Sequence, residues 1–179
     1  MRNMKGLLLL LFLFLAAGGC NDGNDKTVDK ETLVKQGWVN DSAEALTGPE
    51  KEMIAAMLAA YEKETCHQIV VVLVPDLAGE TIEAFSTRTA QAWEIGQEFL
   101  NNGILISIAL QEGSARIEAG SGLDWLVKEK IADTILRREM FPHFREDRLA
   151  AGIIQGLEAL MIEARKRTYP PDHRPSVCL

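Results

Sequence analysis

Two long apolar runs dominate the chain after its first 36 residues. The runs are QIVVVLV at 68–74 and GILISIAL at 103–110, and no charged residue interrupts either of them. Continuous runs of this length and composition indicate strands that are buried on both faces, as in a parallel sheet. The segment ARIEAG at 115–120 alternates apolar and polar residues and predicts a half-exposed strand. The intervening turn sequence, QEGS, makes 103–110 and 115–120 an antiparallel hairpin.

Helical spacing of apolar residues occurs around these runs. In segment 37–65 a short extended piece precedes a helix whose first turn suits Pro49. Its core-facing residues are predicted to be Met53, Ile54, Met57, Leu58 and Tyr61. Further helices are expected at 81–95, with Thr81 as N-cap, and at 126–140 and 147–167, divided at Phe141-Pro142.

The order of these elements predicts an α/β fold. A strand, a helix and a second strand imply a right-handed parallel crossover, and helices should cover both faces of a small sheet. The expected architecture is a three-layer α/β/α sandwich with a small mixed sheet, which combines the parallel crossover with the antiparallel hairpin. The domain spans 37–168, between a polar linker at 20–36 and a proline-rich tail at 169–179.

The first 19 residues are typical of an export signal. Arg2 and Lys5 precede eleven apolar residues, and small residues then lead to Cys20. Eleven residues are too few for a membrane-spanning helix, which needs about 20. The segment resembles a bacterial lipoprotein signal, in which the cysteine is lipidated and becomes the first residue. We therefore expect an exported protein, anchored in the membrane through Cys20 on the periplasmic or extracellular side. A simple secretory signal is the alternative.

Charge narrows the range of partners. Without the first 19 residues, 17 basic and 26 acidic side chains remain, and the formal net charge is −9. An acidic chain is not expected to bind nucleic acid or an anionic membrane face. The balance is compatible with cation binding, although an acidic surface also serves solubility alone.

Two further cysteines, Cys66 and Cys178, remain in the exported chain. An oxidising compartment permits a disulfide between them, which would tie the tail to the start of the first apolar strand. A pair of free thiols is the alternative, because sequence supplies no geometry.

The open end of the predicted hairpin collects oxygen-bearing side chains. A hairpin places Asn101-Asn102 beside Gly120-Ser121-Gly122, where glycine lets the backbone turn closely beside another strand end. Asp124 and Glu129 follow at the start of a helix. Carboxylates and amides are the ligands that calcium prefers, so this edge is a candidate divalent-cation site.

Two other interpretations of this edge stay open. The Gly-x-Gly before a helix is also similar to a phosphate-binding loop, although no lysine follows it. Alternatively, the glycines only turn the chain while the carboxylates favour the helix start. The sequence contains no HExxH, paired CxxC or nucleophile-elbow motif, so the catalytic residues are unknown.

An ordered set of segments resembles the TPM domain family, also called the thylakoid-lumen-phosphatase-like family. The segments cover about 38–162 and are WVND, QIVVVLVPDL, AWEIG, NNGILISIAL, ARIEAGSGL and MFPHFREDRLAAGIIQGLEAL. The resemblance implies an α/β/α sandwich in an exported or membrane-tethered protein. Members of the family are described as acid phosphatases, as calcium-binding proteins or as assistants of membrane complexes.

The resemblance also bears on individual residues. Asp41 matches an early aspartate of the family, Asn102-Gly103 its Asn-Gly pair, and Glu129 a later aspartate. The resemblance thus adds Asp41 to a metal-ligand set of Asp41, Asn102, Asp124 and Glu129. The chain departs from the family where Ser121 replaces an aromatic residue and Trp125 replaces a third glycine.

Three functions are compatible with the sequence. The first is a lipid-anchored accessory domain of the cell envelope that binds calcium and contacts an envelope protein partner. The second, suggested by the resemblance, is a metal-assisted acid phosphatase, in which a metal held by Asp41, Asp124 and Glu129 would polarise the phosphoryl group. The third is a purely structural envelope module that binds through its helix faces.

Overall fold

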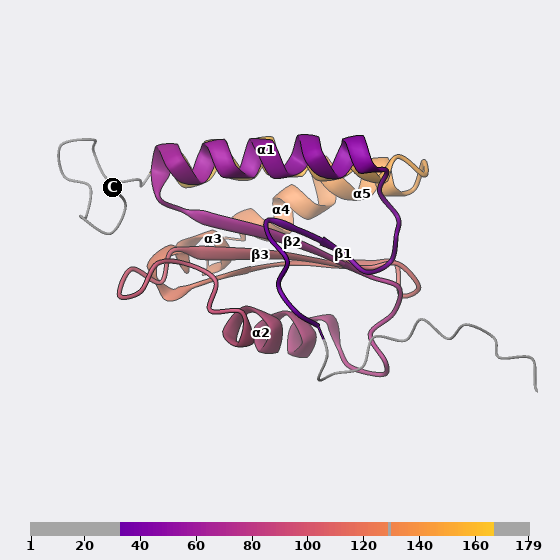
Figure 1. The fold of residues 1–179 in the computed structure, drawn as a ribbon, viewed down its shortest axis with the longest axis horizontal. Helices are drawn as coiled ribbons and strands as arrows, with labels where there is room; N and C mark the ends of the chain where they lie inside the picture. Colours follow the sequence, from indigo (N-terminus) through magenta and orange to yellow (C-terminus); the bar gives the residue numbers. More distant parts are fainter. Residues whose placement is uncertain (1–32, 129, 167–179) are drawn as a thin grey trace, which may run out of the picture.

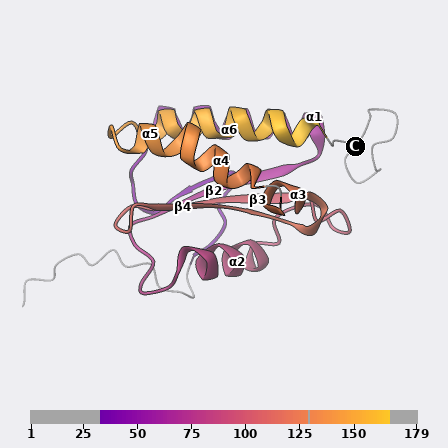
Figure 2. The same cartoon turned by 180° about the vertical axis from the view of Figure 1, so that it is seen from behind.

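The computed structural model describes residues 33–128 and 130–166, and Figures 1 and 2 show the fold from opposite sides. Its strands are β1 (Val39–Asp41), β2 (Gln68–Val74), β3 (Gly103–Ala109) and β4 (Ser114–Ala119). Its α-helices are α1 (Gly48–Thr65), α2 (Ile82–Ala92), α3 (Trp125–Lys128), α4 (Ile131–Ile135), α5 (Phe141–Phe144) and α6 (Leu149–Arg165). A 3₁₀ turn, η1 (Ser121–Leu123), and a π-helical turn, η2 (Leu136–Met140), complete the set.

The four strands form one mixed sheet in the order β1-β2-β3-β4. β1 and β3 both run parallel to β2, whereas β4 runs antiparallel to β3. The predicted parallel crossover and the predicted hairpin are both confirmed. The short extended piece predicted before the first helix is β1, which joins the sheet as its first strand.

Helices cover both faces of the sheet, as Figure 1 shows. α1 and α6 lie on one face with the short helices, and α2 lies on the other. On the α1 side a large apolar core includes Ile54, Leu58 and Leu157, all with no exposed surface. A smaller core under α2 is built around Phe85 and Trp93. The predicted α/β/α layering is confirmed.

The helix α1 begins and ends at residues that its sequence specifies. Thr47 is the N-cap and forms a capping box with Glu50, and Pro49 occupies the first turn. Cys66 ends the helix in the left-handed conformation, with φ 67°. Met53 was predicted to face the core but is 57% exposed, so the buried stripe of α1 is narrower than its apolar pattern.

The prediction of one continuous helix at 126–140 is wrong. Lys130 adopts a left-handed φ of 57°, which separates α3 from α4, and η2 then widens the helix to π geometry. The break predicted at Phe141-Pro142 is also displaced. Pro142 lies in the first turn of α5, where a missing amide hydrogen is tolerated, and the chain turns at 145–148 before α6. Within the described residues, no helix is both long and apolar enough to span a bilayer.

A buried polar pair connects the end of α1 to the start of β2. The Tyr61 hydroxyl lies 3.2 Å from Nδ1 of His67, and both residues are at most 2% exposed. Burial raises the pKa of Tyr61 to about 12 and lowers the pKa of His67 below its ordinary value. The folded protein therefore holds both side chains in their neutral forms at neutral pH.

We predict that protonation of His67 destabilises the fold. Because the pKa of His67 is lower in the folded chain than in the unfolded chain, its contribution is complete above about pH 6.5 and is lost as pH falls toward the folded pKa. Urea unfolding at pH 7.5, 6.5 and 5.5 should show a decline in the wild type that is smaller in His67→Gln. Equal declines in the two proteins would contradict the prediction.

Candidate functional site

The open end of the β3–β4 hairpin brings two backbone segments into direct contact. The Gly120 amide donates a hydrogen bond to the Gly103 carbonyl oxygen at 2.8 Å, and the Gly122 amide donates to the Asn101 carbonyl oxygen at 3.0 Å. The predicted adjacency of Asn101-Asn102 and Gly120-Ser121-Gly122 is confirmed. This edge of the sheet forms one side of the candidate site.

The glycines are required by the closeness of this contact. A Cβ atom at Gly120 would lie 2.2 Å from the Asn101 carbonyl oxygen, and one at Gly122 would lie 2.2 Å from the Leu100 carbonyl oxygen. Gly120 has an ordinary φ of −62°, so a left-handed backbone is not the reason for glycine there. Close backbone approach explains both glycines.

The loop 93–102, which connects α2 to β3, is held by two amide side chains. Asn102, only 3% exposed, accepts a hydrogen bond from the Gln97 amide at 2.8 Å and donates one to the Cys66 carbonyl oxygen at 2.7 Å. Gln68 accepts a hydrogen bond from the Gly96 amide at 2.9 Å. These bonds fix the loop to the start of β2 and the end of α1.

The same loop contains strained backbone conformations. Glu94, Phe99 and Asn101 have positive φ values of 47°, 68° and 46°. Such conformations cost non-glycine residues about 1–3 kcal/mol each and concentrate at functional sites. Phe99 is in addition 89% exposed, the highest fraction among the exposed large apolar side chains of the described residues. The loop thus presents an aromatic ring to solvent at a conformational cost.

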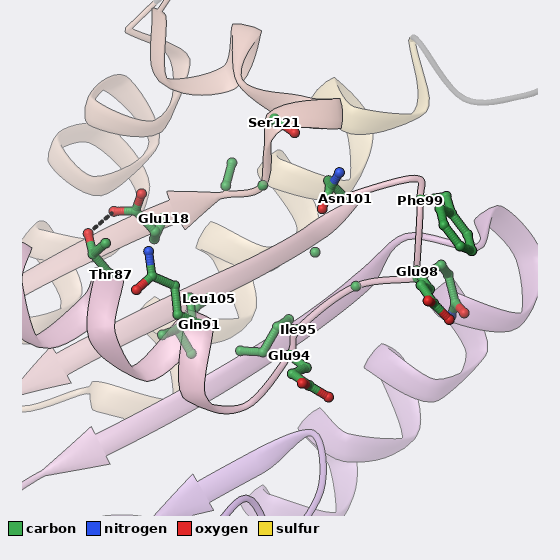
Figure 3. A pocket seen from close by; sticks show the side chains of 16 residues that line it. Thr87, Gln91, Glu94, Ile95, Glu98, Phe99, Asn101, Leu105, Glu118 and Ser121 are labelled. Atoms are coloured by element: carbon green, nitrogen blue, oxygen red, sulfur yellow. Dashed lines mark hydrogen bonds between the residues drawn. The ribbon is translucent and has the colours of Figure 1, made fainter.

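A pocket of about 790 Å³ lies between α2, this loop and the end of β4. Figure 3 shows Thr87, Gln91 and Glu118 on one side of it and Glu94, Glu98 and Phe99 along the loop. Ile95 and Leu105 contribute apolar surface, and Gly120 and Ser121 line the end nearest η1. Three of the lining side chains are carboxylates, and none is a lysine or an arginine.

Glu118 is the least exposed of these carboxylates, and a neighbouring residue fixes its position. Arg116 donates to Oε2 of Glu118 from Nε and Nη2, each at 2.8 Å. The Thr87 hydroxyl lies 3.5 Å from the same oxygen. Glu94 and Glu98 are exposed on the loop. The pocket wall is therefore negatively charged, with one carboxylate oriented by an arginine.

Comparison with known proteins identifies the domain. The family model for the TPM domain matches residues 39–163, which is most of the chain and all of the sheet. The chain belongs to the TPM domain family. No curated protein is similar enough to the chain to match.

Solved structures share the fold of this TPM domain. The N-terminal domain of a protein from P. gingivalis is 27% identical with a TM-score of 0.67, and the match covers 77% of this chain and 86% of that one. The BA42 protein from Bizionia argentinensis is 21% identical with a TM-score of 0.63, covering 73% and 90%. The N-terminal domain of the cg2496 protein from Corynebacterium glutamicum is 16% identical with a TM-score of 0.58, covering 84% and 99%. The last two similarities concern the fold alone.

Asp41 lies far from the other predicted metal ligands. It pairs with Leu73 near the carboxyl end of β2, whereas Gly103, next to Asn102, pairs with Gln68 at the amino end. Five residues of strand place these positions roughly 16 Å apart. Asp41 therefore does not share an ion with Asn102. Its buried carboxylate instead accepts hydrogen bonds from the amides of Ala45 and Leu46, at 3.1 and 3.0 Å, and closes the turn before α1.

The remaining predicted ligands have other contacts or lie outside the described residues. Both amide atoms of Asn102 are used to hold the loop. Asp124 forms an exposed ion pair with Lys128, and Glu129 lies outside the described residues. Within 33–128 and 130–166, no three His, Cys, Asp or Glu side chains are placed together so that they could hold a metal. The divalent-cation site stays a prediction.

The lipid anchor and the disulfide also stay predictions. Cys20 and Cys178 lie outside the described residues. Cys66 is 3% exposed at the end of α1, and its carbonyl oxygen is bonded to Asn102 beside the loop.

Sequence reasoning missed most of the pocket. The hairpin argument selected Asn101, Gly120 and Ser121, but not residues 94–99 of the loop, which form the opposite wall. Glu94, Glu98 and Phe99 follow the end of α2 without any periodic pattern. The helix predicted at 81–95 also ended three residues too late, since α2 ends at Ala92, and Glu94 was therefore placed inside it. The sequence offered no signal for this wall, because the exposure of Phe99 is visible only in the structure.

We predict that Gly120→Ala destabilises the domain by about 1–3 kcal/mol, because its Cβ must displace the Asn101 carbonyl. Gly48→Ala is the matched control, since nothing lies within 4 Å of the added carbon and its backbone is helical. Urea unfolding measures both variants. Equal stability of the two variants would show that the close approach is not rigid.

We also predict that Asp41→Ala costs about 2–3 kcal/mol in the free energy of unfolding, because it leaves two amide hydrogens without their charged acceptor. Asp124→Ala should cost less than about 1 kcal/mol, since its ion pair with Lys128 is exposed. Thermal and urea unfolding without divalent ions compare the two variants. A larger loss in Asp124→Ala would contradict the structural role assigned to Asp41.

Proposed function

We propose that this TPM-domain protein is an accessory binding module of the cell envelope, and that the pocket beside the hairpin end receives a cationic group from its partner. The observation that carries the proposal is the lining of the pocket. Glu94, Glu98 and Glu118 surround it without any basic lining residue, beside apolar surface from Ile95 and Leu105. A lysine or arginine side chain of a partner protein matches this combination, because its aliphatic stem packs on apolar surface while its charge meets carboxylates.

The rim of the pocket supports a protein partner. Phe99 stands almost fully exposed on a loop that is anchored at both ends and conformationally strained. Exposed aromatic residues on a rigid support are typical anchors of protein interfaces. A partner segment with a basic residue next to an apolar one would engage both the pocket and Phe99.

The membrane anchor is part of the same proposal. It is supported by the order of basic, apolar and small residues before Cys20, and by the polar segment that follows. Lipidation at Cys20 would hold the domain beside the membrane on the exported side. Mass spectrometry of the mature protein from its native host tests this step, and an unmodified N-terminus would contradict it.

Calcium, which the sequence analysis predicted, is the second cation to be tested. Carboxylate and amide oxygens are the hard ligands that calcium takes, but the carboxylates that line the pocket are not placed together as a metal site. The metal-assisted phosphatase alternative has less support, because the carboxylate of Asp41, one of its three proposed metal ligands, is buried and accepts hydrogen bonds from two backbone amides. We therefore propose binding rather than catalysis, and the cation is identified by experiment.

The test uses residues 20–179 with Cys20→Ser, and NMR monitors the backbone amide resonances of this chain. We expect a trilysine peptide to shift the amides of Asn101, Gly120 and Ser121 saturably, and triglutamate to leave them unchanged. In a second titration, calcium chloride is added without peptide to protein that was first treated with a chelator. A shift caused by calcium but not by trilysine would replace the basic partner with the ion, and no shift with either would refute the proposal.

Three variants locate the response. Ser121→Tyr restores the aromatic residue that the family resemblance gives at this position and should fill the pocket, whereas Ser121→Ala keeps it open. Glu94→Gln with Glu98→Gln should weaken trilysine binding about tenfold, as expected for the loss of charged contacts. Shifts that survive in Ser121→Tyr would indicate nonspecific attraction to the acidic surface and contradict a pocket site.

A further inference from the structure

The outer edge of β4 is an unpaired strand edge. β4 is the last strand of the sheet, and Figure 2 shows it along the sheet border with α2 on one side and α4 on the other. The Gly120–Gly103 hydrogen bond fixes the alternation of the ladder, so Ser114, Arg116 and Glu118 direct their backbone groups toward β3. The backbone N–H and C=O groups of Ala115, Ile117 and Ala119 point outward and have no partner in the described part of the chain.

The edge carries two charged side chains, Arg116 and Glu118, but lacks three other features that commonly protect an edge strand against pairing. Natural edge strands are commonly blunted by lysine, proline or a bulge. β4 has the sequence SARIEA, with no proline or lysine, and pairs with β3 along its whole length without a bulge. Two of the three residues whose backbone groups point outward are alanines, and their small side chains leave room for a neighbouring strand.

The charges of β4 are complementary to those of a second copy of itself. In an antiparallel pair centred on Ile117, Ile117 faces Ile117 of the partner subunit, and Ala115 faces Ala119 of the partner subunit. Arg116 then faces Glu118 of the partner subunit, and Glu118 faces Arg116 of the partner subunit. Opposite charges directly across two strands stabilise the pair. A two-fold axis through Ile117 relates the two copies, as in most homodimers.

Charge also selects this register over its neighbours. The two adjacent registers that use the same outward backbone groups place Arg116 opposite Arg116 of the partner subunit, or Glu118 opposite Glu118 of the partner subunit. Both arrangements bring like charges together and are disfavoured. Glu118 is equipped for the favoured register, because Arg116 of its own chain bonds only Oε2 and leaves Oε1 available.

We propose that two copies of this chain pair through β4, which joins their sheets into one continuous sheet. The pairing does not depend on the cationic ligand proposed for the pocket. It does place Arg116 of the partner subunit beside Glu118, and therefore at the wall of that pocket.

Charge reversal tests the pairing. Sedimentation equilibrium of residues 20–179 with Cys20→Ser, up to millimolar concentration, should give a reversible dimer for the parent chain. Arg116→Glu and Glu118→Arg each place like charges opposite one another twice, so we expect the dissociation constant of each to rise at least about tenfold. An equimolar mixture of the two variants should dimerise again, because the Glu–Glu edge of one then faces the Arg–Arg edge of the other.

The double variant Arg116→Glu/Glu118→Arg is the matched control, since it restores the pair between residues 116 and 118 and the pair across the interface, and loses only the contact of 4.0 Å between Arg116 and Glu83. Circular dichroism and thermal unfolding confirm that each variant folds, and a non-reducing gel identifies any disulfide-linked dimer. Hydrogen exchange should protect the amides of Ala115, Ile117 and Ala119 as concentration rises. A parent chain that stays monomeric would overturn the proposal, as would a dimer that both reversals leave unchanged or that the mixture does not restore.

Discussion

The parallel pairing of β2 with β3 is the contact on which the rest of the domain depends. The two strands pair over seven residues each, from Gln68 with Gly103 to Val74 with Ala109. Their side chains supply both apolar cores, one under α1 and α6 and the other under α2. Both faces of this strand pair are apolar and must be buried. Each helix therefore packs on one face of the sheet or the other.

Polar side chains at the amino ends of β2 and β3 hold the loop that forms one wall of the pocket. Asn102 and Gln68 hold the loop 93–102 through its backbone amides, and Asn102 also bonds the carbonyl oxygen that ends α1. Glu62 extends this network, because it accepts hydrogen bonds from Trp38 at 2.7 Å and from Gln68 at 3.2 Å. The loop thereby retains its left-handed residues and keeps Phe99 exposed, since the surrounding bonds offset the cost of the strain.

Carboxylates in this domain serve different purposes according to burial. Asp41 is fully buried and is satisfied by two backbone amides, which makes it part of the fold. Glu118 is partly exposed and is oriented by Arg116 at an edge where a ligand or a second chain has access. Identity of residue type therefore does not distinguish a structural carboxylate from a binding one, whereas the partners of its oxygens do.

The sequence by itself determined the layers, the parallel crossover, the hairpin and the need for glycine at its open end. Each of these follows from local patterns: uninterrupted β-branched runs, helical spacing, a turn sequence and the geometry of antiparallel strands. Only the tertiary structure decided which polar side chains meet. Asp41 ends β1, near the carboxyl end of β2, whereas Asn102 lies where β3 begins, at the opposite edge of the same sheet. The pocket wall at 94–99 likewise could not be predicted, because its residues have no periodic pattern. Hydrogen bonds to Gln68 and Asn102 set its position instead.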